Sequence, residues 1–317
     1  AFGANVFRNK MTGIISQINV LYPNYFTTNF PSSSFVPFSN YNSDQRTGLD
    51  FYVNYNKRIG EVDWTIGASA TYYDTKADKR ADVLTYENEY EYRAGRPLDA
   101  IWGLKSDGFF ANAAEVANAD GINGAKPAFG SALAPGDIKY IDQNGDNIID
   151  VKDEVYLGRA GWNGAPFTAG VNISAKYKNF TLFVLGVGRF GGSALKNNNY
   201  FWVNGSDKYS DVVRDRWTPE TQATATFPRL TTLSGDNNFR SSDFWLYSTD
   251  RFDLSKVQLS YAFPQTMFAN SKVFKELGLY VSGFNLLTVA KEREILDLNI
   301  GNTPRTRLYN LGVKARF

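Results

Sequence analysis

The side chains best suited to chemistry lie together in the segment DQNGDNIIDVKD, residues 142–153. Carboxylate and amide oxygens recur there at the spacing of an EF-hand-like loop, whose alternate positions bind a hard cation such as Ca²⁺. The predicted ligands are Asp142, Asn144, Asp146, the carbonyl of Ile148, Asp150 and Asp153. Asn147 replaces the glycine of the sharp turn, and the last ligand is Asp rather than the longer Glu. We therefore expect either a structural calcium site or an Asx-rich turn without an ion.

Two missing residue types narrow the other chemistry that the chain can perform. It contains no His and no Cys, which excludes a Ser-His-Asp triad, histidine zinc sites, thiol nucleophiles and disulfides. The carboxylates of Asp215 and Glu220 have the chemistry of a glycosidase pair, but charged loop residues are usually solvated. A net charge of +2, with scattered basic residues, leaves no nucleic-acid footprint. We predict that the chain is neither an enzyme nor a nucleic-acid-binding protein.

The elements that must carry the acidic loop are predicted to be β-strands. Aromatic residues make up 15% of the chain, and Gly, Asn and Asp turn signals are frequent. The longest apolar run, residues 180–187, is far shorter than the roughly 18 residues of a membrane-spanning helix. Strands of a transmembrane β-barrel instead alternate apolar and polar residues, so average hydropathy stays low, and here mean hydropathy is −0.35.

Alternating segments predict an all-β, antiparallel transmembrane barrel. Nine segments are found, beginning near Phe2, Ile14, Gly48, Asp63, Pro166, Phe180, Lys256, Leu277 and Leu308. Short links are expected at 9–11, 58–61 and 178–179, a medium link at 264–276, and long links at 22–46, 74–165, 191–251 and 288–305. Short turns on the periplasmic side and long external loops are typical of outer-membrane barrels. We therefore predict that 74–165 and 191–251 are long extracellular loops.

The alternation also assigns strand residues to faces. The residues expected to face the lumen are Asp50, Tyr52, Asn54, Tyr73, Asn172, Lys176, Lys314 and Arg316. Beside the short links, the pattern predicts an aromatic layer of Tyr55, Trp64, Tyr177, Phe180, Phe263 and Phe317. Such a layer is the interfacial girdle of a membrane barrel, whereas the alternative is a soluble β-sandwich whose core these aromatics fill.

Several segments of the chain carry a resemblance to a known family. They are RAGRPLDAIWGLKSDGFF at 93–110, PGDIKYIDQNGDNIIDVKDEVYLG at 135–158, DRWTPE and FPRL at 215–220 and 227–230, LSKVQLSYAFP at 254–264, LYVSGFNLLT at 279–288 and PRTRLYNLGVKARF at 304–317. In order and spacing they resemble the C-terminal half of the SusC/RagA family of TonB-dependent outer-membrane transporters, known from the Bacteroidetes. The resemblance covers most of the chain.

The resemblance implies an architecture and a location. The family barrel has about 22 strands, of which this chain would supply about the last nine. A plug domain and a TonB-contacting segment would lie outside this sequence. The expected location is the cell outer membrane, in contact with lipid and lipopolysaccharide and with a SusD-like surface lipoprotein.

The resemblance also implies a function, active import of a bulky oligosaccharide or oligopeptide. Aromatic loop residues can stack on sugars or pack against peptide, and the candidates are Trp102, Trp162, Tyr200 and Trp202, with packing inside the loops as the alternative. Other functions that the residues leave open are a passive outer-membrane pore, an adhesion barrel and a soluble surface β-sandwich that binds a ligand.

Overall fold

The computed structural model describes residues 1–17, 38–81, 86–119, 132–161, 164–203, 205, 209–231, 237–268, 273, 275–298 and 306–316. Within them, eight strands form one antiparallel sheet in the order β1-β2-β3-β8-β9-β12-β13-β14. Their bounds are β1 Phe2–Gln17, β2 Phe38–Ile59, β3 Val62–Lys79, β8 Phe167–Tyr177, β9 Phe180–Phe190, β12 Arg251–Ala262, β13 Glu276–Val289 and β14 Leu308–Arg316. Each strand pairs with the next sheet strand along the chain, which is the meander that the alternation predicts.

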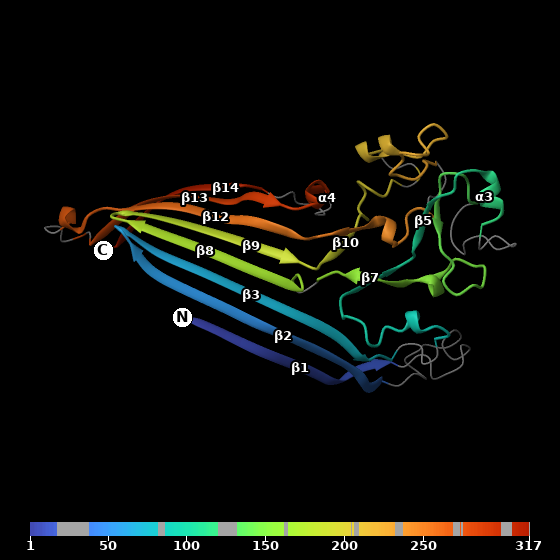
Figure 1. Cartoon of the computed structure of the whole chain (residues 1–317), viewed down its shortest axis with the longest axis horizontal. Helices are drawn as coiled ribbons and strands as arrows, with labels where there is room; N and C mark the ends of the chain where they lie inside the picture. The colour runs from blue at the N-terminus through green and yellow to red at the C-terminus, as the bar shows by residue number, and fades with distance from the viewer. Residues whose placement is uncertain are drawn as a thin grey trace.

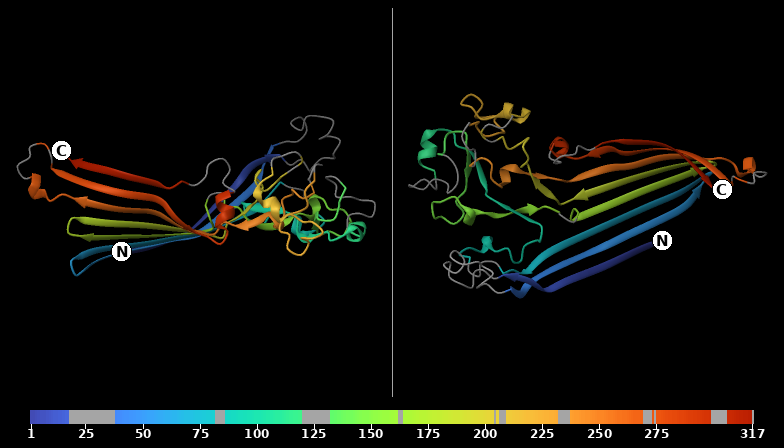
Figure 2. Two further views of the ribbon diagram at one scale, coloured as in Figure 1. Left: turned by 90° about the horizontal axis from the view of Figure 1, so that it is seen from above. Right: turned by 180° about the vertical axis from the view of Figure 1, so that it is seen from behind.

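The sheet is a single curved layer with very different connections at its two ends (Figures 1 and 2). At one end, tight turns join β2 to β3 and β8 to β9, as predicted. Gly60 and Lys178 in these turns have φ angles of 61° and 50°, the left-handed conformation that two-residue hairpins favour. At the other end, long segments leave β3 and β9 and fold together beyond the sheet.

The first two predicted segments form one strand, β1, so the sheet has eight strands where the sequence pattern suggests nine. The expected link at 9–11 does not occur, because Lys10 and Met11 pair with Gln45 and Asp44 of β2. The chain is irregular instead at Gly13, which has a φ angle of 71° and lies where the pairing between β1 and β2 shifts register. A left-handed glycine of this kind forms a bulge that bends a strand without ending it.

Two strands extend far beyond the length that a bilayer needs. β2 has 22 residues, which corresponds to about 70 Å at the usual rise of a strand. β3 has 18 residues and ends at Lys79, where the sequence pattern predicts a loop from Asp74 onward. The wall therefore continues past the predicted membrane segment on the side of the long connections.

The long connections form a folded body, which we call the loop body and define as the described residues of 80–166 and 191–250. It contains three two-stranded sheets that pair β4 with β7, β5 with β6 and β10 with β11. Their bounds are β4 Ala100–Gly103, β5 Ser106–Phe109, β6 Ile138–Tyr140, β7 Val155–Arg159, β10 Ser193–Leu195 and β11 Leu246–Ser248. The helices are α3 Ala113–Ala117 and, between β13 and β14, α4 Arg293–Leu298; single 3₁₀ turns occur at Glu89–Glu91, Val151–Asp153, Asp211–Asp215, Asp243–Trp245 and Gln265–Phe268.

Among the residues described above, no helix has the length and apolarity required to cross a membrane.

Candidate functional site

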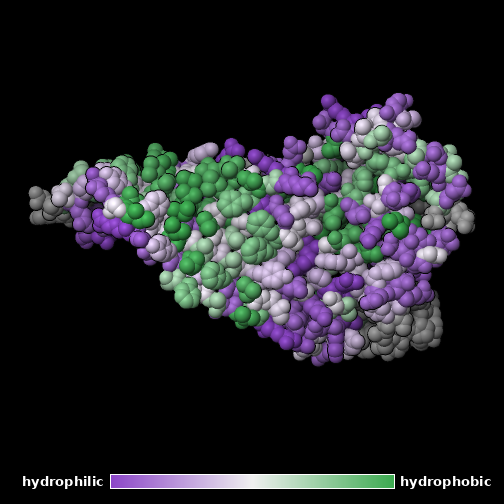
Figure 3. Space-filling view, in the orientation of Figure 1, coloured by the Kyte–Doolittle hydropathy of each residue, from purple (hydrophilic) through white to green (hydrophobic). Residues whose placement is uncertain are grey.

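One face of the sheet is a field of exposed apolar side chains. Paired residues on neighbouring strands point to the same face, and one such row runs through Leu182, Leu259, Val281 and Leu311 across β9, β12, β13 and β14. Leu311 is 84% exposed, so little protein covers this row. Figure 3 shows the hydrophobic surface spread over the strands. We call this face the apolar face, and it has the chemistry of a surface in contact with hydrocarbon.

Aromatic residues border the apolar face at both ends. Phe167 and Phe190 meet at one end with ring centroids 6.0 Å apart, and Phe180 and Tyr261 meet at the other at 4.8 Å. β8 spans 11 residues from Phe167 to Tyr177, or about 33 Å along the strand and about 25 Å across a bilayer at the usual tilt. The apolar band thus has the height of a bilayer core. Of the predicted aromatic layer, Tyr177 and Phe180 lie in the row of Tyr261, while Phe317 lies outside the described residues.

The opposite face, which we call the polar face, carries the residues predicted to face the lumen. The row of Asn54 continues through Gly67 and Asn172, and the row of Tyr52 continues through Ser69 and Gly170. Arg316, also predicted to face the lumen, forms an ion pair with Glu276 at 2.6 Å. Side chains on this face therefore meet water or other polar groups while their neighbours in sequence meet the apolar field.

A charged network on the polar face escapes prediction from sequence. Asp253 accepts hydrogen bonds from Arg189 at 2.8 Å, Arg251 at 3.2 Å and the Thr288 hydroxyl at 2.7 Å. These groups come from β9, β12 and β13, and the Asp253 side chain is only 10% exposed. Buried charges persist where partners are well placed, so the network ties three strands together near the loop body.

The loop body has its own hydrophobic core, built from both long connections. Its buried members are Leu104, Ile138, Tyr140, Ile149, Phe201, Val203, Val213, Phe227 and Trp245. Hydrogen bonds join the two connections at this core. Asn238 Oδ1 accepts from the Ile138 backbone N–H at 2.8 Å, and Trp245 Nε1 donates to the Asn238 carbonyl at 2.8 Å. The two predicted loops are thus one packed unit, which their sequence spacing does not reveal.

The aromatic residues predicted to contact substrate mostly pack inside the loop body. Trp202 lies against Trp245, with ring centroids 6.4 Å apart, and Tyr200 lies edge-on to Phe201 at 5.2 Å. The Arg93 guanidinium stacks 4.7 Å from the centre of the Trp102 ring. Trp162 lies outside the described residues.

The described members of this predicted set do not share one cavity. Trp202 borders a cavity of about 290 Å³ together with Asp150, Glu154 and Arg240. Trp102 and Tyr200 do not line it. Burial raises the pKa of Glu154, with the Arg93 charge opposing that shift. A substrate role for these aromatics stays a prediction, and Trp202 is the member beside a cavity whose lining combines apolar and charged side chains.

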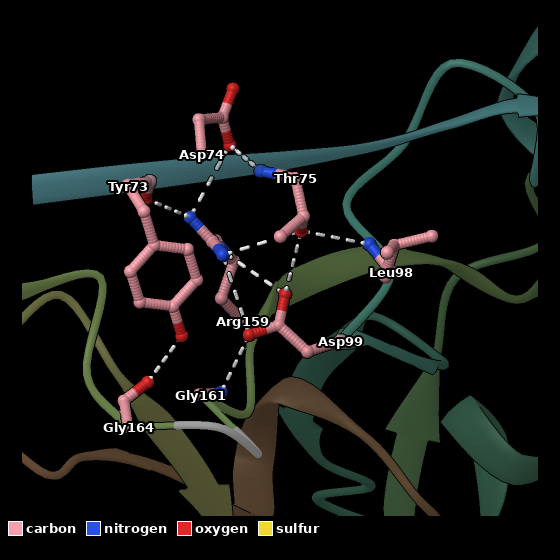
Figure 4. A network of polar contacts seen from close by, with 8 residues as sticks. All are labelled: Tyr73, Asp74, Thr75, Leu98, Asp99, Arg159, Gly161 and Gly164. Carbon is pink, nitrogen blue, oxygen red and sulfur yellow. Dashed lines mark hydrogen bonds and ion pairs between the residues drawn. The ribbon is translucent and has the colours of Figure 1, made fainter. Parts of the chain in front are cut away.

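A network centred on Asp99 and Arg159 attaches the loop body to β3 (Figure 4). Arg159 Nε donates to Asp99 Oδ1 at 3.0 Å, and the Gly161 N–H donates to Asp99 Oδ2 at 2.8 Å. Arg159 Nη1 also reaches the Tyr73 carbonyl at 3.2 Å, while the Tyr73 hydroxyl donates to the Gly164 carbonyl at 2.5 Å. The Asp99 side chain is 6% exposed, so this ion pair is shielded from water. It fixes β7 and the segment before β8 against the end of the wall.

The predicted calcium ligands lie in a compact turn whose carboxylates accept backbone N–H groups. Asp142 accepts from Gly145 at 2.7 Å and from Asn147 at 2.8 Å, in keeping with a left-handed Asn147 at φ 61°. Asp153 is fully buried and accepts from Gln143 and Asp150, both at 2.8 Å.

This turn does not gather its acidic side chains around one point. Burial raises the pKa of Asp153, and the Asp142 charge acts in the same direction. Among the described residues, no three acidic side chains converge as a metal site requires. The predicted ligand side chains in both halves of the turn accept backbone N–H groups, Asp146 from Ile148, Asp150 from Lys152 and Asp153 from Asp150. Calcium binding stays a prediction.

Comparison with known proteins adds to these observations. No family profile matches the chain. TonB-dependent receptor P26 of Formosa agariphila is 28% identical over 261 residues, which cover 76% of this chain and 25% of that receptor. The RagAB peptide transporter superposes with a TM-score of 0.69 at 18% identity, and the RagAB peptide importer in its closed-closed state with 0.68 at 18%. Each superposition covers 99% of this chain and 33% of the solved chain.

The chain thus spans about a quarter to a third of the length of these relatives. The structural likeness shows a shared fold across nearly the whole chain, and the sequence relative is itself a TonB-dependent receptor. The two-faced sheet, with an apolar band as tall as a bilayer core, agrees with both findings. In sequence the chain is thus similar to a TonB-dependent receptor, and its sheet shares the fold of part of the barrel wall in the RagAB transporters.

Proposed function

We propose that the protein is an active importer of a bulky nutrient, an oligosaccharide or an oligopeptide, and that this chain forms the C-terminal part of its barrel. The observation that carries the proposal is the pairing of a two-faced membrane wall with a packed loop body, on a fold shared with a peptide importer. A passive pore requires no such folded mass at the mouth of the wall. Catalysis is not part of the proposal, because the relatives are receptors and transporters.

The loop body is the proposed docking place for a SusD-like surface lipoprotein. It lies beyond the end of the wall that carries the long connections, where a surface lipoprotein would approach. The ion pair of Asp99 and Arg159 holds the loop body against β3, so a partner would bind a surface of fixed position. Within it, Trp202 is the proposed substrate contact, since its indole N–H is buried without a hydrogen-bond partner among the described residues and the ring borders the cavity near Asp150.

Uptake of labelled cargo by cells that express the full-length receptor with its lipoprotein tests the proposal. Defined oligopeptides and oligosaccharides are supplied separately, and accumulation is compared with that of a variant lacking the TonB-contacting segment. We expect accumulation of one cargo class above the external concentration, lost in the variant. Equilibration of both classes without dependence on TonB would instead establish a passive pore, and no uptake with firm cell attachment would favour an adhesion barrel.

We also propose that the turn at 142–153 holds a structural Ca²⁺. The residues that would hold it are Asp142, Asn144, Asp146, Ile148, Asp150 and Asp153, whose oxygens suit a hard cation. A bound cation would offset the mutual repulsion of these carboxylates and stiffen the turn. Calorimetric titration of the full-length receptor with Ca²⁺ tests this. We expect binding that Asp142→Asn weakens and Asp107→Asn, an exposed loop-body carboxylate paired with Lys139, leaves unchanged; absence of binding would refute the proposal.

A further inference from the structure

Above the apolar face, the outer surface of β1, β2 and β3 changes abruptly in character. Val6, Leu49 and Tyr72 form the last apolar row across these strands. Four residues further along β1 and β3 the same face presents Lys10 and Lys76, on either side of Gln45. That step is about 13 Å along the strand, or about 10 Å in height at barrel tilt. Figure 3 shows the hydrophobic field giving way to hydrophilic surface toward these strand ends.

A cavity of about 680 Å³ opens on this surface, and basic side chains dominate its lining. Arg8, Lys10, Lys76 and Lys79 contribute four positive charges, and Asp78 contributes the one carboxylate among the described lining residues. Lys10 Nζ is paired with Asp78 at 3.0 Å. Lys76 and Lys79 are exposed and form no ion pair with any residue in the described part of the chain. The hollow therefore carries an excess of about three positive charges.

The side chains around the cavity are positioned rather than scattered. Arg8 Nη2 donates to Gln45 Oε1 at 2.7 Å, which directs the guanidinium across the β1–β2 pair. Lys79 Nζ lies 6.0 Å from the centre of the Tyr41 ring. Nearby carboxylates are engaged elsewhere, because Asp44 pairs with Arg80 and Asp74 lies 3.3 Å from Arg159. No carboxylate is therefore left to neutralise Lys76 and Lys79 from the neighbouring described residues.

We propose that this cluster is a binding site for the phosphate groups of a lipopolysaccharide in the outer leaflet. Arg and Lys bind phosphate through charge-assisted hydrogen bonds, and basic pockets at the edge of a membrane bind lipid headgroups. The height of the cluster above the last apolar row is that of a headgroup. Acyl chains of the same molecule would continue down the rows of Val6, Leu49 and Phe51 directly below. This continuity favours a lipid phosphate over free phosphate, and the inference rests on membrane placement, not on the transported cargo.

The full-length receptor in detergent, stripped of bound lipid, tests the site. Binding of purified lipid A is compared between the native receptor, Lys76→Ala/Lys79→Ala and the control Lys105→Ala/Lys291→Ala, whose lysines are exposed and lie outside the eight-stranded sheet. We expect the Lys76/Lys79 variant to bind lipid A about tenfold more weakly or worse, and the control to bind as the native receptor does. Heat-modified migration on gels checks that every variant remains a folded barrel.

Two further arms identify the ligand group. Removing the phosphates of lipid A should weaken its binding to the native receptor at least as much as the Lys76/Lys79 substitutions weaken binding of intact lipid A. In a separate competition, inorganic phosphate at equal concentration should not displace bound lipid A. Equal binding by the native receptor and the Lys76/Lys79 variant would overturn the proposal. So would tight binding of dephosphorylated lipid A, or displacement of lipid A by inorganic phosphate.

Discussion

The sharpest test of the wall is an arginine placed on its apolar face. Val171 lies near the middle of β8, is 41% exposed, and shares a row with Ala68 and Gly186. If this row faces the bilayer centre, Val171→Arg forces a guanidinium into hydrocarbon at a cost of about 2–4 kcal/mol. The same substitution at Tyr177, in the row near the short turns, should cost only about 0–1 kcal/mol because the side chain reaches the interface. Ser174→Arg, on the polar face, should behave like a substitution in water.

Unfolding by guanidinium of the full-length receptor, refolded into lipid vesicles, measures these differences through tryptophan fluorescence. We expect Val171→Arg to lower the free energy of unfolding by about 3 kcal/mol relative to the other two variants, a shift of about two orders of magnitude in the equilibrium constant. The yield of folded receptor in the outer membrane should follow the same order. If Val171→Arg is no more destabilising than Ser174→Arg, the apolar face does not meet lipid, and the assignment of faces is refuted.

Three further predictions concern the loop body. Asp99→Asn should lower the stability of the loop body by about 2–3 kcal/mol, because the Arg159 guanidinium, 11% exposed, loses its buried partner. Amide hydrogen exchange in β7 should become faster in this variant. The control Asp107→Asn should leave the exchange rate of β7 unchanged. Trp245→Ala should cost about 3–5 kcal/mol by opening a cavity in the core, measured as protease cleavage in 191–250 with the strands intact. Burial lowers the pKa of Lys196 below its usual value of 10.5, and the Glu292 charge opposes that shift. Between the two pKa values the unfolded chain binds more protons than the folded protein, so the stability of the loop body should rise as the pH rises toward 10.5. Lys196→Met should abolish this rise in thermal unfolding measured at a series of pH values.

Alternation predicts the wall because the physics that produces it is local. A strand between lipid and water must change polarity at every residue, so the facing of Tyr52, Asn54 and Asn172 follows from sequence alone. The same signal fails at Gly13, because composition does not distinguish a bulge from a turn. It also underestimates β2 and β3, since above the membrane the outer row turns basic and alternation by hydropathy disappears.

The loop body is harder to predict because its contacts join residues far apart in the chain. Ile138 meets Asn238 at a separation of 100 residues, and no periodicity marks such a pair. Trp202 illustrates the consequence, because its residue type suggests a ligand contact, but only the fold shows that its ring packs against the core beside Trp245 and also borders a cavity. Asp99 lies within a segment that carries the family resemblance and Arg159 directly follows another, yet their pairing follows only from the folded backbone.

The shared core of the two connections sets an order of assembly. Residues on opposite sides of that core are separated along the chain by β8 and β9, and pairing of these strands brings Pro166 and Gly191 together. The hairpin thereby shortens the loop that the core must close, which lowers its entropic cost. The sheet should therefore form before the loop body folds. A receptor whose loop body resists protease must then already have formed this part of its barrel.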